Sequence, residues 1–135
     1  VWNASRQSLY ALGYKALREY KLENWDSDAP SLKMVANWEL PMTSGHDLSP
    51  VDDSRMLISA HEGVMWFNVD EGTFSPFEPL ADVKNVKSVN YDPKTGRVIY
   101  TKAEISWWTH DVYQQNPDKT ITIDSLNIYK VRPVR

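Results

Sequence analysis

The stretch from Gly45 to Pro79 contains four short apolar runs, and each run is closed by residues that favour turns. The runs are Leu48–Val51, Met56–Ala60, Val64–Val69 and Thr73–Phe77. Glycine, aspartate and serine stand between them, and these residues reverse the direction of a chain readily. Apolar runs this short are typical of strands joined by hairpins and not of helices. The stretch therefore predicts an antiparallel meander of four strands, which is the arrangement of one β-propeller blade.

Two interpretations fit the segment Ser8–Tyr20. Its apolar residues fall near helical spacing, which would give an amphipathic helix with a glycine at its centre. The alternative is a pair of strands, Ser8–Leu12 and Ala16–Leu22, joined by a turn that contains the same glycine. A shift that lays Leu9 on Met56 aligns these two strands with the second and third apolar runs of the central stretch. Repeats of roughly 40–50 residues are typical of propeller blades, so the alignment favours the strands.

The chain divides into three such units, at about 1–41, 45–81 and 86–135. In the first unit the fourth strand is expected at Leu32–Leu40, after a polar loop. The third unit is less regular, and Ile105–Lys119 interrupts it as an insertion. Its expected elements are strands at Val86–Tyr91 and Arg97–Thr101, a helical turn near Val112–Gln115, and strands at Thr120–Ile123 and Asn127–Val131.

The predicted fold is all-β and propeller-like, with about two and a half to three four-stranded antiparallel blades in a single partial propeller domain. Propellers close with roughly four to eight blades, so the count leaves two blade faces open. We expect further blades upstream, or a second chain that completes the ring. The chain begins at Val1 and not at Met, which indicates a removed leader or a fragment of a longer protein. A stable fragment is expected to self-associate through its open blade faces.

Composition restricts the classes of partner. The net charge is −3 with no basic cluster, so neither nucleic acid nor an anionic membrane surface is an expected partner. No apolar run approaches the roughly 20 residues that cross a bilayer, so membrane insertion is not expected. The chain has no cysteine, which excludes disulfides, cysteine-bound metals and a thiol nucleophile.

Residues 1–22, 45–51 and 86–109 carry a resemblance to the C-terminal part of an uncharacterised bacterial β-propeller family, which is similar to WD-, NHL- and YVTN-type propellers. The resemblance implies the propeller fold. It also implies a periplasmic or extracellular protein, because such families are often exported and some are linked to glycan use. The dipeptide Trp25–Asp26 departs from the WD pattern, because it lies in a polar loop and not at the end of a strand.

His46 and Asp47 precede the first strand of the second unit, at a position that faces the central channel of a propeller. An imidazole beside a carboxylate could act as a general base or hold a metal. The alternative is a histidine that closes a loop and bonds a neighbouring blade. A three-histidine metal site would need His61 and His110 to converge on His46, and nothing in their spacing requires that.

Trp107 and Trp108 lie in the insertion, where the blade pattern does not require them. Exposed indole rings can stack on sugar rings while a neighbour such as His110 bonds the hydroxyls. The alternative is that one or both indoles fill the gap between blades, and alternation along the chain would bury one and expose the other.

The candidate ligand-binding residues are therefore Trp107, Trp108, His110, His46 and Asp47. We expect a non-catalytic module that binds a glycan or a protein and needs no cofactor. The competing prediction is a propeller-type lyase or hydrolase with a histidine-based site, metal-dependent or not, in the central channel.

Overall fold

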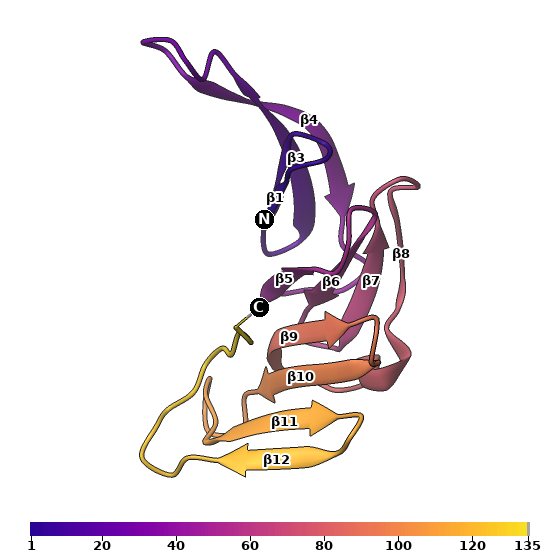
Figure 1. The fold of residues 1–135 in the computed structure, drawn as a ribbon, viewed down its shortest axis with the longest axis vertical. Helices are drawn as coiled ribbons and strands as arrows, with labels where there is room; N and C mark the ends of the chain where they lie inside the picture. The colour runs from indigo at the N-terminus through magenta and orange to yellow at the C-terminus, as the bar shows by residue number, and fades with distance from the viewer. Residues whose placement is uncertain (135) are drawn as a thin grey trace.

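The computed structural model describes residues 1–134 and is almost entirely β-structure. Its twelve strands form three four-stranded antiparallel sheets, and in each sheet the strands lie side by side in chain order. The one helical element in these residues is a short 3-10 helix, Glu78–Leu80, between the second and third sheets. The all-β prediction is confirmed at this level. No sheet closes on itself, and the sheets follow one another along the long axis of the molecule (Figure 1).

Short turns connect most neighbouring strands within a sheet. The first sheet contains β1 (Trp2–Asn3), β2 (Ser8–Leu12), β3 (Ala16–Glu23) and β4 (Ser31–Glu39). The second contains β5 (Asp47–Pro50), β6 (Arg55–Ser59), β7 (Val64–Asn68) and β8 (Thr73–Pro76). The third contains β9 (Val86–Asp92), β10 (Arg97–Lys102), β11 (Asp111–Gln115) and β12 (Lys119–Thr122).

The ambiguous segment Ser8–Tyr20 forms the strands β2 and β3, as the alignment with the central stretch favoured. The strands pair antiparallel with Leu9 opposite Tyr20 and Leu12 opposite Leu17. The helical spacing of the apolar residues does not decide the structure here. Pairing lets Leu17 enter the core while the next residue, Arg18, stays exposed, and this alternation fits a strand.

Two expectations for the third unit are wrong. Val112–Gln115 is not a turn of helix, because it belongs to β11 and pairs with β10 on one side and β12 on the other. Asn127–Val131 is not a strand, because only an isolated bridge between Thr109 and Ile128 connects it to regular structure. Ile105–Lys119 is accordingly a loop followed by a β11–β12 hairpin. Residue 135, the last position of the unit, lies outside the described residues.

The three sheets pack face to face through two apolar clusters. The cluster between the first and second sheets is centred on Tyr10, Leu17, Met56, Ile58 and Phe67. The cluster between the second and third sheets is centred on Leu57, Val64, Phe77, Val89 and Val98. Successive side chains of a strand point to opposite faces, so β6 sends Met56 and Ile58 one way and Leu57 the other. The second sheet is therefore buried on both faces.

Each end of the stack presents one face away from the second sheet. On the first sheet, the residues opposite in direction to Tyr10 and Leu17 form what we call the first outward face. Its apolar part consists of Leu9, Tyr20, Leu22, Leu32 and Met34, and Arg18 and Asn37 lie at one end of it. On the third sheet, the residues opposite in direction to Val89 and Val98 form the last outward face; near β9 they are Ser88, Asn90 and Thr101. The first of these faces is mainly apolar, and the second is polar where β9 meets the tail, although Ile121 also lies on it.

The chain after β12 returns to the middle of the molecule, where its last described residues lie near β5 (Figure 1). We call the segment 127–134 the tail. It crosses the inner part of the last outward face, where Asn90 donates a hydrogen bond from Nδ2 to the carbonyl of Val131 (3.0 Å). The tail therefore covers part of a sheet face that would otherwise be open at this end of the stack.

Candidate functional site

Asp47 stands at the start of β5, and its carboxylate is buried, with 2% of the residue exposed. Oδ1 forms ion pairs with Lys130 (3.2 Å) and with Arg132. Oδ2 accepts a hydrogen bond from the backbone N–H of Val89 on the neighbouring sheet (3.1 Å). Asp47 therefore joins the second sheet to the third and fixes the tail to both.

A chain of hydroxyl groups holds the tail on the last outward face. The N–H of Val131 donates to Ser88 Oγ (3.0 Å), and Thr101 Oγ1 donates to the carbonyl of Tyr129 (2.8 Å). Ser88 and Thr101 are bonded to each other (2.8 Å), so Ser88 is the donor in that bond. Side chains thus satisfy the backbone groups of Tyr129 and Val131 on the face of the sheet.

His46 contacts a lysine of the neighbouring sheet and not the carboxylate beside it. Its Nε2 lies 2.9 Å from Nζ of Lys87, and its carbonyl accepts a hydrogen bond from Nζ of Lys130 (2.7 Å). Burial, followed by the positive charge of Lys87, lowers the pKa of His46 below its ordinary value. Burial and the nearby Lys130 likewise lower the pKa of Lys87. A lowered pKa favours the neutral imidazole, whose Nε2 can accept a hydrogen bond from the ammonium group of Lys87.

The loop that carries the two tryptophans folds back on itself through a bridge between Ile105 and Trp108. Trp107 is 58% exposed, and its ring meets the ring of Tyr129 edge to face, with centroids 5.8 Å apart. Trp108 is half-buried and makes a similar edge contact with the ring of His110 at 4.9 Å. One indole is therefore exposed and the other partly covered, as alternation along the chain predicts.

The tail brings the two groups of candidate residues onto one strip of surface. Tyr129 contacts Trp107, and the next residue, Lys130, contacts His46 and Asp47. The ammonium group of Lys130 also lies 5.6 Å from the centre of the Tyr129 ring. His110 is held at the far end of the strip, where its Nδ1 is 2.7 Å from the carbonyl of Leu126.

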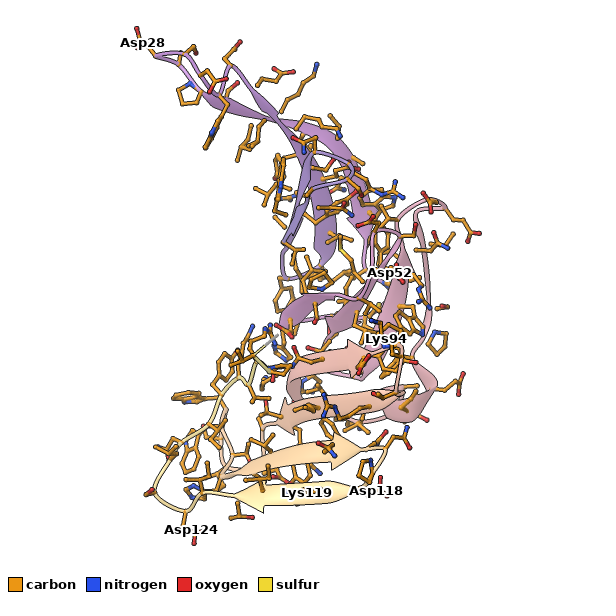
Figure 2. The ribbon with its side chains drawn as sticks, in the orientation of Figure 1. Asp28, Asp52, Lys94, Asp118, Lys119 and Asp124 are labelled. Atoms are coloured by element: carbon orange, nitrogen blue, oxygen red, sulfur yellow. The ribbon has the colours of Figure 1, made fainter. Side chains whose placement is uncertain are left out.

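This strip lies at one set of strand ends. His46 and Lys87 stand at the starts of β5 and β9, whereas Asp52 and Lys94 lie in the turns that follow these strands. Figure 2 labels Asp52 and Lys94 at these opposite strand ends, and only the last residues of the tail, Pro133 and Val134, reach the pocket that Lys94 lines. The candidate residues therefore share one rim of the stack, and the other rim consists of short turns.

The three histidines do not assemble a metal site. Within residues 1–134 no group of three or more His, Cys, Asp or Glu side chains is placed to hold an ion. His61 lies in the β6–β7 turn, and His110 lies at the start of β11 in the third sheet. Glu62, beside His61, bonds the backbone N–H and the hydroxyl of Thr43.

Sequence reasoning missed four residues of the strip: Lys87, Tyr129, Lys130 and Arg132. The tail was interpreted as a strand, which would have given Tyr129 and Lys130 only a position in a sheet. Nothing in the sequence indicated Lys87, because a lysine after Val86 is the ordinary alternation of a strand. The basic sequence at the end of the chain was a signal for Lys130 and Arg132.

No protein-family model matches this chain, and no curated protein matches it either. In the described part of the chain, no helix has the length and apolar character that crossing a membrane requires.

Proposed function

We propose that this protein is a propeller-type module that binds a glycan without catalysing a reaction. Three consecutive meanders packed face to face in chain order support the propeller interpretation, because propeller blades are built and stacked in this way. In that arrangement β5 and β9 are inner strands. The strip at their starts then lies at the mouth of the central channel, where propellers commonly offer a binding surface.

The observation that carries the proposal is the exposed indole of Trp107, which Tyr129 supports from the side. An exposed aromatic ring that a second ring supports from one side has fewer conformations to lose, so stacking on it costs less entropy. Lys130 follows Tyr129 in the chain, and its ammonium group can donate hydrogen bonds to the hydroxyls of a sugar ring. An aromatic platform beside polar donors suits a sugar, which has apolar faces and a polar edge.

The test is a glycan array followed by calorimetry on the parent protein and the Trp107→Ala variant. We expect the affinity for the bound glycan to fall about tenfold or more, because the stacking surface is removed. Trp108→Ala is the matched control, since Trp108 is half-buried against His110 and is expected to affect binding less. Equal affinities in the parent and both variants would remove the tryptophan platform from the proposal.

The competing lyase or hydrolase gains no support from the contacts of Asp47. In residues 1–134 its carboxylate is engaged by Lys130, Arg132 and the N–H of Val89. His46 is paired with Lys87 instead, so the carboxylate does not orient the imidazole as a catalytic base requires. We therefore favour binding over catalysis on this rim.

Self-association belongs to the same proposal. The first outward face exposes about half of Leu32 and Met34, at 51% and 53%. Paired residues on β3, Leu22 and Tyr20, extend the apolar surface across the sheet. We propose that a second copy of the chain covers this face when no further blade does. The resemblance to exported propellers supports a periplasmic or extracellular location.

A further inference from the structure

The group of side chains around His46 and Asp47, at the starts of β5 and β9, contains more positive than negative charge. Two cationic side chains, Lys130 and Arg132, share the buried carboxylate of Asp47, and a third, Lys87, bonds the adjacent His46. The whole chain has a net charge of −3, so this local excess runs against the overall balance. A local potential of this kind concentrates anions at the surface.

Of these three cations, Lys87 is the one for which the described residues provide no acidic partner. It is only 8% exposed, and its ammonium group bonds the neutral Nε2 of His46. Asp47 pairs with other groups instead, because Oδ1 is bonded to Lys130 and Arg132 and Oδ2 accepts from the N–H of Val89. A neutral imidazole can accept a hydrogen bond from the ammonium group, but it carries no negative charge that would balance the lysine.

The nearest other titratable groups, Glu62 and His61, do not balance the positive charge of Lys87. Glu62 is close enough to influence the pKa of His46, but its carboxylate is bonded to Thr43. His61, beside it, is exposed in the β6–β7 turn. A largely buried cation without a counter-charge is unfavourable, and an anion bound beside it would relieve that cost.

We propose that Lys87, Lys130 and Arg132 bind an acidic group of the ligand, so that the glycan of this module is one that carries carboxylate or sulfate groups. This inference rests on the proposed glycan-binding function and names the class of glycan. The arginine can hold a carboxylate or sulfate through two parallel N–H bonds, and the lysines supply point charges.

The platform and the charges are spaced for a single ligand. Tyr129 and Lys130 are consecutive, so their Cα atoms are about 3.8 Å apart. Tyr129 contacts the exposed Trp107, and Lys130 contacts Asp47 beside Arg132. A sugar ring stacked at the aromatic end would therefore direct an acidic substituent toward the cationic end of the same strip.

The experiment measures binding to an array of acidic glycans in which each is paired with its carboxyl-reduced or desulfated counterpart. The protein variants are Lys87→Gln, Arg132→Gln and the control Lys94→Gln. Glutamine at position 87 keeps a donor for His46 while it removes the charge. Lys94 lies in the turn that follows β9, on the opposite rim (Figure 2). Circular dichroism establishes that each variant is folded.

We expect the parent to bind acidic glycans at least tenfold more tightly than their neutral counterparts. Lys87→Gln and Arg132→Gln are each expected to remove most of that preference, whereas Lys94→Gln is expected to retain it. Raising the salt concentration should weaken acidic binding far more than neutral binding.

The other outcomes separate this inference from the proposed function. Equal binding of acidic and neutral glycans would overturn the acidic class and leave glycan binding standing. If no glycan binds, titration with inorganic sulfate tests whether the anion site exists. Sulfate binding that depends on Lys87, without binding of any glycan, would keep the anion site and refute the glycan function. No binding of glycan or sulfate would refute both.

Discussion

The two outward faces of the stack differ in the side chains that they present. The first outward face is mainly apolar, and within residues 1–134 no segment of the chain packs over its exposed residues Leu32 and Met34. The last outward face is polar near β9, where Ser88 and Thr101 bond the tail. The same four-stranded unit therefore ends the molecule in two different ways.

The difference shows how one chain can finish one end of a stack and leave the other ready for a partner. Hydroxyl and amide side chains bond a passing backbone that has no strand partners of its own. Leucine and methionine side chains offer nothing to a backbone and gain free energy only when another apolar surface covers them. The second sheet is buried on both faces. Either outer sheet would be buried in the same way if another sheet packed on its outward face.

The largest expected effect comes from removing the anchor of the tail with Asp47→Ala. The change leaves Lys130 and Arg132 without their carboxylate and Val89 without an acceptor. We expect a loss of about 2–3 kcal/mol in the free energy of unfolding, less than for a fully buried pair because both cations are partly exposed. Urea denaturation measures it.

Asp28→Asn is the matched control for that prediction, since Asp28 lies at the tip of the long β3–β4 hairpin (Figure 2). Its free energy of unfolding should stay within about 0.5 kcal/mol of the parent value. Equal stability of the Asp47→Ala protein and the parent would mean that the tail is not held through Asp47.

A smaller effect is expected from Thr101→Val, which keeps the shape of the side chain and removes its hydroxyl. The carbonyl of Tyr129 and the hydroxyl of Ser88 each lose a partner on a buried surface. We expect a cost of about 1–2 kcal/mol, together with faster amide exchange at Val131. Unchanged exchange in the tail would show that the hydroxyl chain does not hold it.

The order of strands in this molecule could be predicted because it is local. Each sheet consists of consecutive segments, and the apolar runs and the turn residues between them lie in adjacent stretches of sequence. β11 escaped prediction because Val112 and Tyr113 are surrounded by tryptophans, glutamines and acidic residues that hide its alternation. The tail was wrongly predicted as a strand for the opposite reason. Asn127–Val131 alternates like a strand in sequence, but it packs on polar side chains.

The candidate site was predictable only in part. Trp107 was identifiable because the strand pattern did not require it. The environment of Asp47 was not, because its partners Lys130 and Arg132 stand 83 and 85 residues later in the chain. Charge compensation between positions that distant leaves no periodicity or spacing that can be detected in a single sequence.

The smallest effect on stability, and the sharpest test of the comparison, comes from the double variant Leu32→Lys and Met34→Lys. Both side chains are about half exposed, so the free energy of unfolding of the monomer should change by less than about 1 kcal/mol. Self-association should be lost, because two lysines on the first outward face would repel a second copy. Light scattering over a concentration series measures the mass. Ile121→Lys places the same charge on the last outward face and should leave association intact; if it dissociates the protein instead, the second copy is bound at the other end.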